Sequence, residues 1–349
     1  MTIPNVKPER EIQNCIDLAT PDGRLVAESV GWSRRPLHRT SLGAGWGRRK
    51  RWEYWAVLSE EAMFAVTLAD LDYAGLAAVS LLEYDTWTIT EKALLTPVAA
   101  GLSMPQQFAD PQAAVHFAAL GLQVELCSQA AHTQLRAEFG SGKGHLIADL
   151  RVERPPTQQS LSVVIPWSST RYQYTSKHVG LPVSGTVMVG GRRYEFTSDQ
   201  GARGVIDHGR GRWPRNTAWI WACAAEPPAH RAETVGFNLG GRWTQGTGLT
   251  ENGLFIGSRL EKLGEELSFE FDRQDWRRPW RILAPSKRVD LVFSPLHCRR
   301  LGALPAWLPL GARLDWRLGR YNGSLVTEAG ECIKVKDLLG WAEELTARW

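Results

Sequence analysis

The sequence lacks a long hydrophobic run. Its most apolar stretch, YAGLAAVSLL at residues 73–82, is far shorter than the segment of about 20 residues that a membrane-spanning helix needs. The start, MTIPNVKPEREIQNC, has no apolar core of the kind a secretory signal carries. We therefore expect no stable membrane insertion and a soluble, cytoplasmic protein.

Cysteine and histidine are sparse and poorly spaced for metal binding. The five cysteines, at positions 15, 127, 223, 298 and 332, are odd in number and form no C-x-x-C pair. The eight histidines include neither H-x-H nor H-E-x-x-H. This pattern favours reduced thiols over a disulfide framework and predicts no metal site.

Motifs for nucleotides, acyl transfer and nucleic acids are also missing. GSGKG at 140–144 lacks the upstream glycine and the following Ser or Thr of a phosphate-binding loop, and no G-x-G-x-x-G or G-x-S-x-G occurs. The formal charge is only +4, and the basic runs at 48–51 and 277–278 are short. We expect no cofactor and no nucleic-acid partner.

The composition is otherwise that of a globular protein with many large aromatic side chains. Of 349 residues, 43% are hydrophobic and 22% charged, while tryptophan is unusually frequent at 16 and methionine scarce at 4. This length predicts one large or two medium domains. The tryptophans serve either core packing or a ligand.

Short segments rich in Val, Trp, Phe, Tyr and Thr, separated by Gly, Asn, Asp and Pro, predict an all-β protein. Segments 51–59, 63–72 and 76–89 form one series of expected antiparallel strands, and 122–129, 133–139, 145–153 and 161–166 form a second. Further expected strands run from 217–225 to 331–337. Gly190-Gly191, Asn252-Gly253 and Asn322-Gly323 are expected hairpin turns.

About fifteen such strands cannot form one open sheet without exposing unpaired edges. We predict two lipocalin-like antiparallel β-barrels, or strongly curved sheets, with a short C-terminal helix. The helix is expected at KDLLGWAEELTARW, residues 336–349, where Leu338, Leu345 and Trp349 share one face and Glu343 and Glu344 the other. The expected division is an N-terminal extension at 1–30, one barrel domain at 31–170 and a second at 171–349.

The densest chemistry lies in DHGRGRWPRNTAWIWACAA, residues 207–225. In TAWIWACAA, strand alternation places Thr217, Trp219, Trp221 and Cys223 on a bulky face and small residues on the other. The preceding GRGRWPRN, with two glycines and a proline, predicts a loop or bulge. We expect this loop to bring polar side chains to a barrel mouth or a domain junction.

The chain resembles proteins with the domain of unknown function DUF2804. The residues that carry the resemblance are YTSK (174–177), LPVSGTV (181–187), DHGRGRWPRNTAWIWA (207–222), GFNLG (236–240), TEN (250–252), PWRI (279–282), RVDLVFSP (288–295) and the ending GRYNG…IKVKDLLGWAEELTARW. SGTVMVGGRRYEF followed by IDHGRG is also similar in layout to the carotenoid-hydratase and AttH-like proteins with tandem lipocalin-like barrels. The first resemblance implies no established activity.

Three functions are open at this point. The first is binding of a lipophilic small molecule, isoprenoid or fatty-acid-like, in an aromatic-lined cavity. The second is a cofactor-independent hydratase, isomerase or cyclase with Asp207 as general acid and His208 assisting. The third is a structural or protein-interaction module whose barrels are filled by their own side chains. The candidate ligand-binding residues are Tyr174, Lys177, Arg210, Arg212, Trp213, Arg215, Trp219, Trp221 and Glu251.

Each candidate also has a purely structural interpretation. Asp207 can pair with Arg203 or Arg210 at a turn. The tryptophans can be core residues between strands. The arginines at 210, 212 and 215 can bind a carboxylate or phosphate head group, or can simply be solvated.

Overall fold

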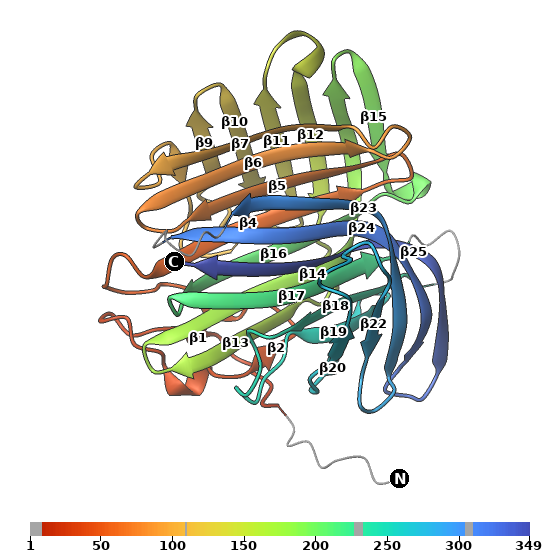
Figure 1. Cartoon of the computed structure of the whole chain (residues 1–349). Coiled ribbons are helices and arrows are strands. Elements are labelled where there is room, and N and C mark those ends of the chain that lie inside the picture. Colours follow the sequence, from red (N-terminus) through yellow and green to blue (C-terminus); the bar gives the residue numbers. More distant parts are fainter. Residues whose placement is uncertain (1–8, 109, 227–232, 304–309) are drawn as a thin grey trace.

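The computed structural model describes residues 9–108, 110–226, 233–303 and 310–349 (Figure 1). The first eight residues of the expected N-terminal extension lie outside the described residues. Within the described part of the chain, no helix is both long and apolar enough to cross a membrane. All five cysteines are described and are free thiols.

The first large sheet follows the order β7-β6-β5-β4-β16-β14-β12-β11-β10-β9-β8; off this path, β13 and β15 pair with β14, and β2 pairs with β13. Its strands are β2 (Trp32–Ser33), β4 (Arg49–Leu58), β5 (Ala62–Asp70), β6 (Ala74–Glu83), β7 (Ile89–Pro97), β8 (Leu102–Ser103), β9 (Val115–Ala119), β10 (Leu122–Ser128), β11 (His132–Phe139), β12 (Leu146–Glu153), β13 (Leu161–Ser168), β14 (Arg171–Val189), β15 (Arg192–Thr197) and β16 (Arg203–Arg212). The two expected series of strands are present.

The second large sheet follows the order β20-β19-β18-β17-β25-β24-β23-β22-β21. Its strands are β17 (Asn216–Ala225), β18 (Val235–Gly241), β19 (Asn252–Ile256), β20 (Arg259–Leu263), β21 (Ser268–Glu270), β22 (Trp280–Leu283), β23 (Val289–Ala303), β24 (Gly311–Val326) and β25 (Cys332–Arg348). A small parallel pair joins β1 (Ile16–Asp17) and β3 (His38–Arg39). The described helical elements are the short 3-10 turns Ala27–Ser29, Gly142–Gly144 and Ser198–Gln200.

Both large sheets curl over themselves and enclose separate apolar cores. In the first, β4–β7 cross in front of β9–β12 (Figure 1), and side chains such as Phe64 and Phe117 meet between them. In the second, Phe237 from β18 and Leu291 from β23 belong to one buried cluster. The prediction of an all-β protein with strongly curved antiparallel sheets is confirmed.

A third apolar cluster lies between the two sheets. It includes Trp213, Trp221 and Trp341, together with Val163 and Val205 of the first sheet. On β17, Trp221 and Cys223 face this cluster, whereas Ile220, Ala222 and Ala224 face the second sheet's own core. The predicted bulky and smooth faces of this strand are therefore confirmed, and the bulky face points at the first sheet.

The expected C-terminal helix is wrong. Residues 332–348 form β25, which pairs with β17 on one edge and β24 on the other. A helix here would leave both neighbours with unpaired backbone groups, so tertiary pairing overrides the local helical period. Glu343 and Glu344, expected on an exposed face, are buried.

The turn predictions have mixed outcomes. Gly190-Gly191 connects β14 and β15 as expected. Asn252-Gly253 instead opens strand β19, and Gly323 lies inside β24 at a register shift, with φ +141°. The expected loop at 209–216 is a strand up to Arg212, and only residues 213–215 connect the two large sheets.

Sheet membership therefore changes at residues 213–215, because β14, β15 and β16 belong to the first sheet. The expected division at 170 into two domains stays a prediction, because sheet membership does not decide which segments fold independently.

Candidate functional site

Asp207 and His208 lie on opposite faces of β16. In register with β14, Asp207 is opposite Lys177, and His208 is opposite Ser176. Successive side chains of a strand point to opposite faces, so Asp207 faces the junction between the sheets and His208 faces the interior of the first sheet. The structure thus separates the expected proton-relay pair.

A buried lysine joins two carboxylates across the junction. Lys177 Nζ lies 2.9 Å from Asp207 Oδ2 and 3.4 Å from Glu251 Oε2. It also lies 4.2 Å from the ring centroid of Trp221, a cation–π contact. Four predicted residues, Lys177, Asp207, Trp221 and Glu251, are therefore brought together from both sheets, and with Glu343 we call them the junction cluster.

The ion pairs outweigh the cost of burying the lysine. Burial by itself lowers the pKa of Lys177, but the charges of Asp207 and Glu251 together raise it above its ordinary value. Asp207 also accepts hydrogen bonds from Thr175 Oγ1 at 2.7 Å and from Trp52 Nε1 at 3.2 Å. Both oxygens of Asp207 are thus engaged, with Lys177 in place of the Arg203 or Arg210 partner considered from the sequence.

Glu251 is the last residue of the connection between β18 and β19. Its Oε1 accepts a hydrogen bond from Trp243 Nε1. Burial raises the pKa of Glu251, partly offset by Lys177 and Trp243. A Cβ on Gly240 would lie 2.1 Å from Glu251 Oε1, so the absence of a side chain at this position makes room for the carboxylate.

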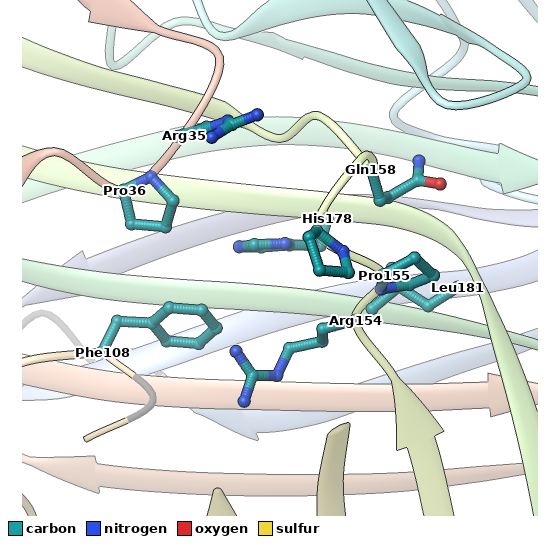
Figure 2. Close-up of a pocket in the computed structure, with 9 residues that line it drawn as sticks. Arg35, Pro36, Phe108, Arg154, Pro155, Gln158, His178 and Leu181 are labelled. Atoms are coloured by element: carbon teal, nitrogen blue, oxygen red, sulfur yellow. The ribbon is translucent and has the colours of Figure 1, made fainter. Parts of the chain in front are cut away.

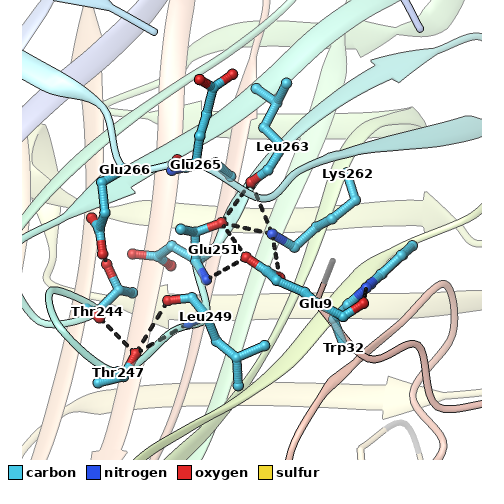
Figure 3. Close-up of polar contacts among 12 residues, drawn as sticks. Glu9, Trp32, Thr244, Thr247, Leu249, Glu251, Lys262, Leu263, Glu265 and Glu266 are labelled. Atoms are coloured by element: carbon cyan, nitrogen blue, oxygen red, sulfur yellow. Dashed lines mark hydrogen bonds and ion pairs between the residues drawn. The ribbon is translucent and has the colours of Figure 1, made fainter. Parts of the chain in front are cut away.

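The neighbours of Glu251 in the TEN stretch are held by hydrogen bonds, and Figure 3 shows the polar contacts of this region, among them the Glu9–Lys262 ion pair. Thr250 donates from its backbone N–H, at 2.9 Å, and from its hydroxyl, at 3.0 Å, to Glu9 Oε1. Glu9 in turn forms an ion pair of 2.8 Å with the buried Lys262. Asn252 Oδ1 accepts from the backbone N–H of Gly240 at 2.7 Å. Asn252 therefore does not form the expected turn; its side chain instead links β19 to β18.

Glu343 is a site residue that the sequence interpretation missed. On β25 it lies opposite Trp221 of β17, and its Oε1 accepts a 2.9 Å hydrogen bond from Trp219 Nε1. Burial raises the pKa of Glu343 to about 7, although the Trp219 hydrogen bond opposes this, and the charge of Lys177 does so too. The predicted helix at residues 336–349 put Glu343 on an exposed polar face. Alternation along a β-strand instead puts Glu343 on the same face as Trp341 and Leu345, and this alternation is the signal that could have identified it.

The predicted tryptophans lie in the junction cluster, as Trp221 does, or beside it, as Trp213 and Trp219 do. Trp213 stacks on Trp243 at 5.7 Å and lies 5.7 Å from Trp219. Trp221 donates to Asn238 Oδ1 at 2.7 Å and lies 5.6 Å from Tyr54. Trp213 and Trp221 are buried, whereas Trp219, Trp52 and Tyr54 are partly exposed. The aromatic residues therefore provide both packing and an accessible rim.

The three arginines do not converge on a head-group site. Arg210 is fully buried on the His208 face, where its Nη2 lies 3.5 Å from Glu53 Oε1. Arg212 donates to the carbonyl of Ala44, and Arg215 is exposed in the connection between the sheets. Their common role in binding an anionic head group, expected from the sequence, therefore has no support in their arrangement.

Glycines at 209 and 211 explain why this arginine-rich stretch is a strand and not a loop. A Cβ on Gly209 would lie 2.2 Å from the ring of Trp52, and one on Gly211 would lie 2.1 Å from the Gln173 side chain. The missing side chains let large residues of β4 and β14 cross over β16.

Tyr174 and His208 belong to the opposite face, with Glu53. His208 Nδ1 lies 3.4 Å from Glu53 Oε1, and the Tyr174 and His208 ring centroids are 6.1 Å apart. Burial and the charge of Arg210 lower the pKa of His208 to about 4. At neutral pH His208 is therefore an uncharged imidazole, on the far side of the strand from Asp207.

The hollows in the described part of the protein include two at some distance from the predicted tryptophans. One, of about 270 Å³, opens beside Phe108, Arg154 and His178 (Figure 2), and the other, of about 350 Å³, lies over β10–β12. Neither is lined by Trp213, Trp219 or Trp221.

The chain belongs to the family described as "Domain of unknown function (DUF2804)", which matches residues 9–349. Comparison with curated protein sequences gives no match. Similar solved structures include a Nitrosomonas europaea protein designated AttH, at 12% identity and a TM-score of 0.51, covering 85% of this chain and 92% of that one. This similarity in fold agrees with the predicted lipocalin-like arrangement of two curled sheets.

Two further solved structures are similar over comparable lengths. CghA with Sch210972 is 12% identical, with a TM-score of 0.48, and covers 86% of this chain and 89% of that one. Kievitone hydratase from Nectria haematococca is 10% identical, with a TM-score of 0.48, and covers 87% and 89%.

Proposed function

We propose that the protein binds a lipophilic small molecule at the junction between its two curled sheets. The observation that carries this proposal is the partly exposed aromatic rim of Trp52, Tyr54 and Trp219 around a buried charged cluster. Large aromatic side chains offer apolar area together with N–H or O–H groups that can orient a ligand. An isoprenoid or fatty-acid-like body suits such a surface.

Ligand capture from a lipophilic cell extract tests this proposal. The purified protein is incubated with the extract, re-isolated and analysed by mass spectrometry. We expect one or a few enriched molecules with the wild type and their loss with Trp219→Ala. Trp46→Ala is the matched control, because Trp46 is 64% exposed, and it should retain the ligand. No enrichment with the folded wild type, or equal retention by Trp219→Ala, would overturn the proposal.

A second candidate is cofactor-independent acid–base chemistry on that ligand, of the hydratase or isomerase kind. The observation that favours it is the Glu343 carboxyl group, whose pKa near 7 suits a group that both donates and accepts protons at neutral pH. In this proposal Glu343 takes the role of general acid that the sequence suggested for Asp207, because both Asp207 oxygens are engaged by Lys177, Trp52 and Thr175.

In a hydration by this route, the protonated Glu343 donates its proton to one carbon of a polarised double bond. A water oxygen adds to the other carbon and then loses a proton to a carboxylate of the cluster, so that one water is added in total. Glu251, which is paired with Lys177, is the candidate acceptor, and return of its proton to Glu343 through water restores both groups. Isomerisation would use the same donor and acceptor without the water.

The variant Glu343→Gln separates binding from catalysis. We expect products from the wild type, none from Glu343→Gln, and ligand still retained by Glu343→Gln. The rate should fall as the pH rises above about 7, because the donor must be protonated. A ligand recovered unchanged from the wild type would contradict catalysis and leave the binding proposal intact.

A further inference from the structure

The smaller hollow lies on the opposite face of β14 from the junction cluster. Its lining combines cationic and apolar side chains, among them Arg35, Phe108, Arg154, His178, Pro155 and Leu181. Figure 2 shows the Arg154 guanidinium extending toward Phe108, with the His178 side chain reaching into the same space. Its volume of about 270 Å³ suits a small organic molecule better than a long lipid.

The charge of this hollow is positive and is not cancelled locally. None of its nine lining residues is acidic, and Arg35 and Arg154 form no ion pair with a described carboxylate. Glu53, deeper in the first sheet, is engaged by Arg210 and His208. Arg35 and Arg154 therefore line the hollow without an ion-pair partner among the described residues.

Hydrogen bonds fix the Arg154 guanidinium but leave one of its nitrogens without an acceptor among the described residues. Its Nε donates to Thr133 Oγ1 at 3.2 Å, and its Nη2 donates to the carbonyls of Gln129 and His132. Its Nη1 has no hydrogen-bond acceptor among the described residues. A rigid guanidinium with a free N–H is well suited to an oxyanion.

The floor of the hollow is also built for a polar contact. His178 is 7% exposed, and its Nε2 lies 3.1 Å from Ser176 Oγ, which lies 2.8 Å from Ser162 Oγ. Behind it, the fully buried His208 has no hydrogen-bond partner at Nε2 among the described residues. Phe108 covers both imidazoles, with ring centroids 5.0 Å from His178 and 4.9 Å from His208.

We propose that this hollow is a second binding site, for a small monocarboxylate with a planar or alicyclic apolar body. Arg154 Nη1 receives the carboxylate, Arg35 adds a second positive charge on the opposite side of the hollow, and Phe108, the prolines and Leu181 contact the apolar part. The ligand is amphipathic because five of the nine lining residues are apolar: Pro36, Phe108, Pro155, Pro156 and Leu181. This proposal is independent of the junction site, since the two face opposite sides of β14.

Calorimetric titration of the full chain with benzoate, 2-naphthoate and cyclohexanecarboxylate tests the site. We expect at least one to bind with 1:1 stoichiometry and a Kd of about 1 mM or tighter. The neutral analogue 2-naphthalenemethanol and inorganic phosphate should bind about tenfold more weakly or not at all, because each supplies only half of the recognised chemistry.

Arginine variants localise the binding. Arg154→Gln should weaken carboxylate binding about tenfold, because it removes the guanidinium that receives the carboxylate, and urea denaturation checks that the variant is folded. The control Arg277→Ala, at an exposed arginine outside the hollow, should leave the Kd unchanged, and so should Trp219→Ala at the junction. Phe108→Ala is a second test, with a loss of affinity for 2-naphthoate greater than that for benzoate.

Three results would overturn the proposal. The first is that none of the carboxylates binds to folded wild-type protein. The second is that affinity is unchanged in Arg154→Gln or in Phe108→Ala. The third is that phosphate binds as tightly as the carboxylates, which would show a site for bare anions.

Discussion

Replacing Lys177 with methionine tests whether this lysine stabilises two buried carboxylates, that of Asp207 from the first sheet and that of Glu251 from the second, by pairing with both. The ammonium lies 2.9 Å from Asp207 and 3.4 Å from Glu251, and its side chain is only 6% exposed. At an effective dielectric constant of about 20, these distances correspond to attractions of about 6 and about 5 kcal/mol. Desolvation of the three ions opposes most of this, and removal of one partner of a buried pair typically costs about 3–5 kcal/mol.

We therefore expect Lys177→Met to lower the free energy of unfolding by about 3–5 kcal/mol at neutral pH, measured by urea denaturation. The deficit should shrink as the pH falls, because burial raises the pKa of Glu251 and its protonation removes a charge that lost its partner. In the wild type, the folded-state pKa of Lys177 is raised, so its contribution is complete below the unfolded pKa and is lost only as the pH rises through the folded value.

Lys143→Met is the matched control, because Lys143 is exposed in the Gly142–Gly144 turn, and it should change stability by less than about 0.5 kcal/mol. If Lys177→Met is as stable as the wild type at neutral pH, the lysine does not compensate the carboxylates. The same conclusion would follow from a deficit that is independent of pH.

Three other perturbations address the packing and charges around the junction. Trp341→Ala removes a fully buried side chain of the inter-sheet core and should cost about 3–5 kcal/mol in urea denaturation, whereas Trp46→Ala should be nearly neutral. Gly240→Ala should destabilise the protein and weaken ligand retention, because its Cβ would lie 2.1 Å from Glu251 Oε1, while Gly144→Ala meets open space. Glu343 has a folded-state pKa of about 7 against an ordinary 4.5, so between these values the folded state binds more protons and wild-type stability falls as pH rises. Glu343→Gln should lack this fall across that window, and equal slopes for both proteins would refute a buried, protonated Glu343.

The sequence predicted particular parts of the site for definite reasons. Strand alternation in TAWIWACAA placed Trp219, Trp221 and Cys223 on the junction face, because that pattern depends only on the period of two in an extended chain. The resemblance-bearing stretches indicated Lys177, Asp207 and Glu251 as candidates. Their contact with one another follows from a register between strands far apart in sequence, which no local pattern encodes.

The predictions that the structure overturns rested on local sequence patterns, whereas contacts with residues distant in sequence decide the structure at these positions. The helical spacing of Leu338, Leu345 and Trp349 is real, but β17 and β24 each offer β25 a full row of backbone partners, which outweighs a weak local preference. The glycines at 209 and 211 indicated a loop, yet they serve close side-chain crossings over a strand. Asp207 and His208 were grouped because they are adjacent in sequence, although adjacency in a strand places them on opposite faces.

The sequence by itself determined that the protein is all-β, with aromatic side chains alternating with small ones, because these features follow from local periodicity and composition. It also indicated curved sheets, because so many strands in one open sheet would leave unpaired edges. Only the tertiary structure decided which charges meet. The buried lysine, its carboxylates and Glu343 come from four strands or strand ends in two sheets. Their protonation depends on burial and distance, which are properties of the folded chain alone.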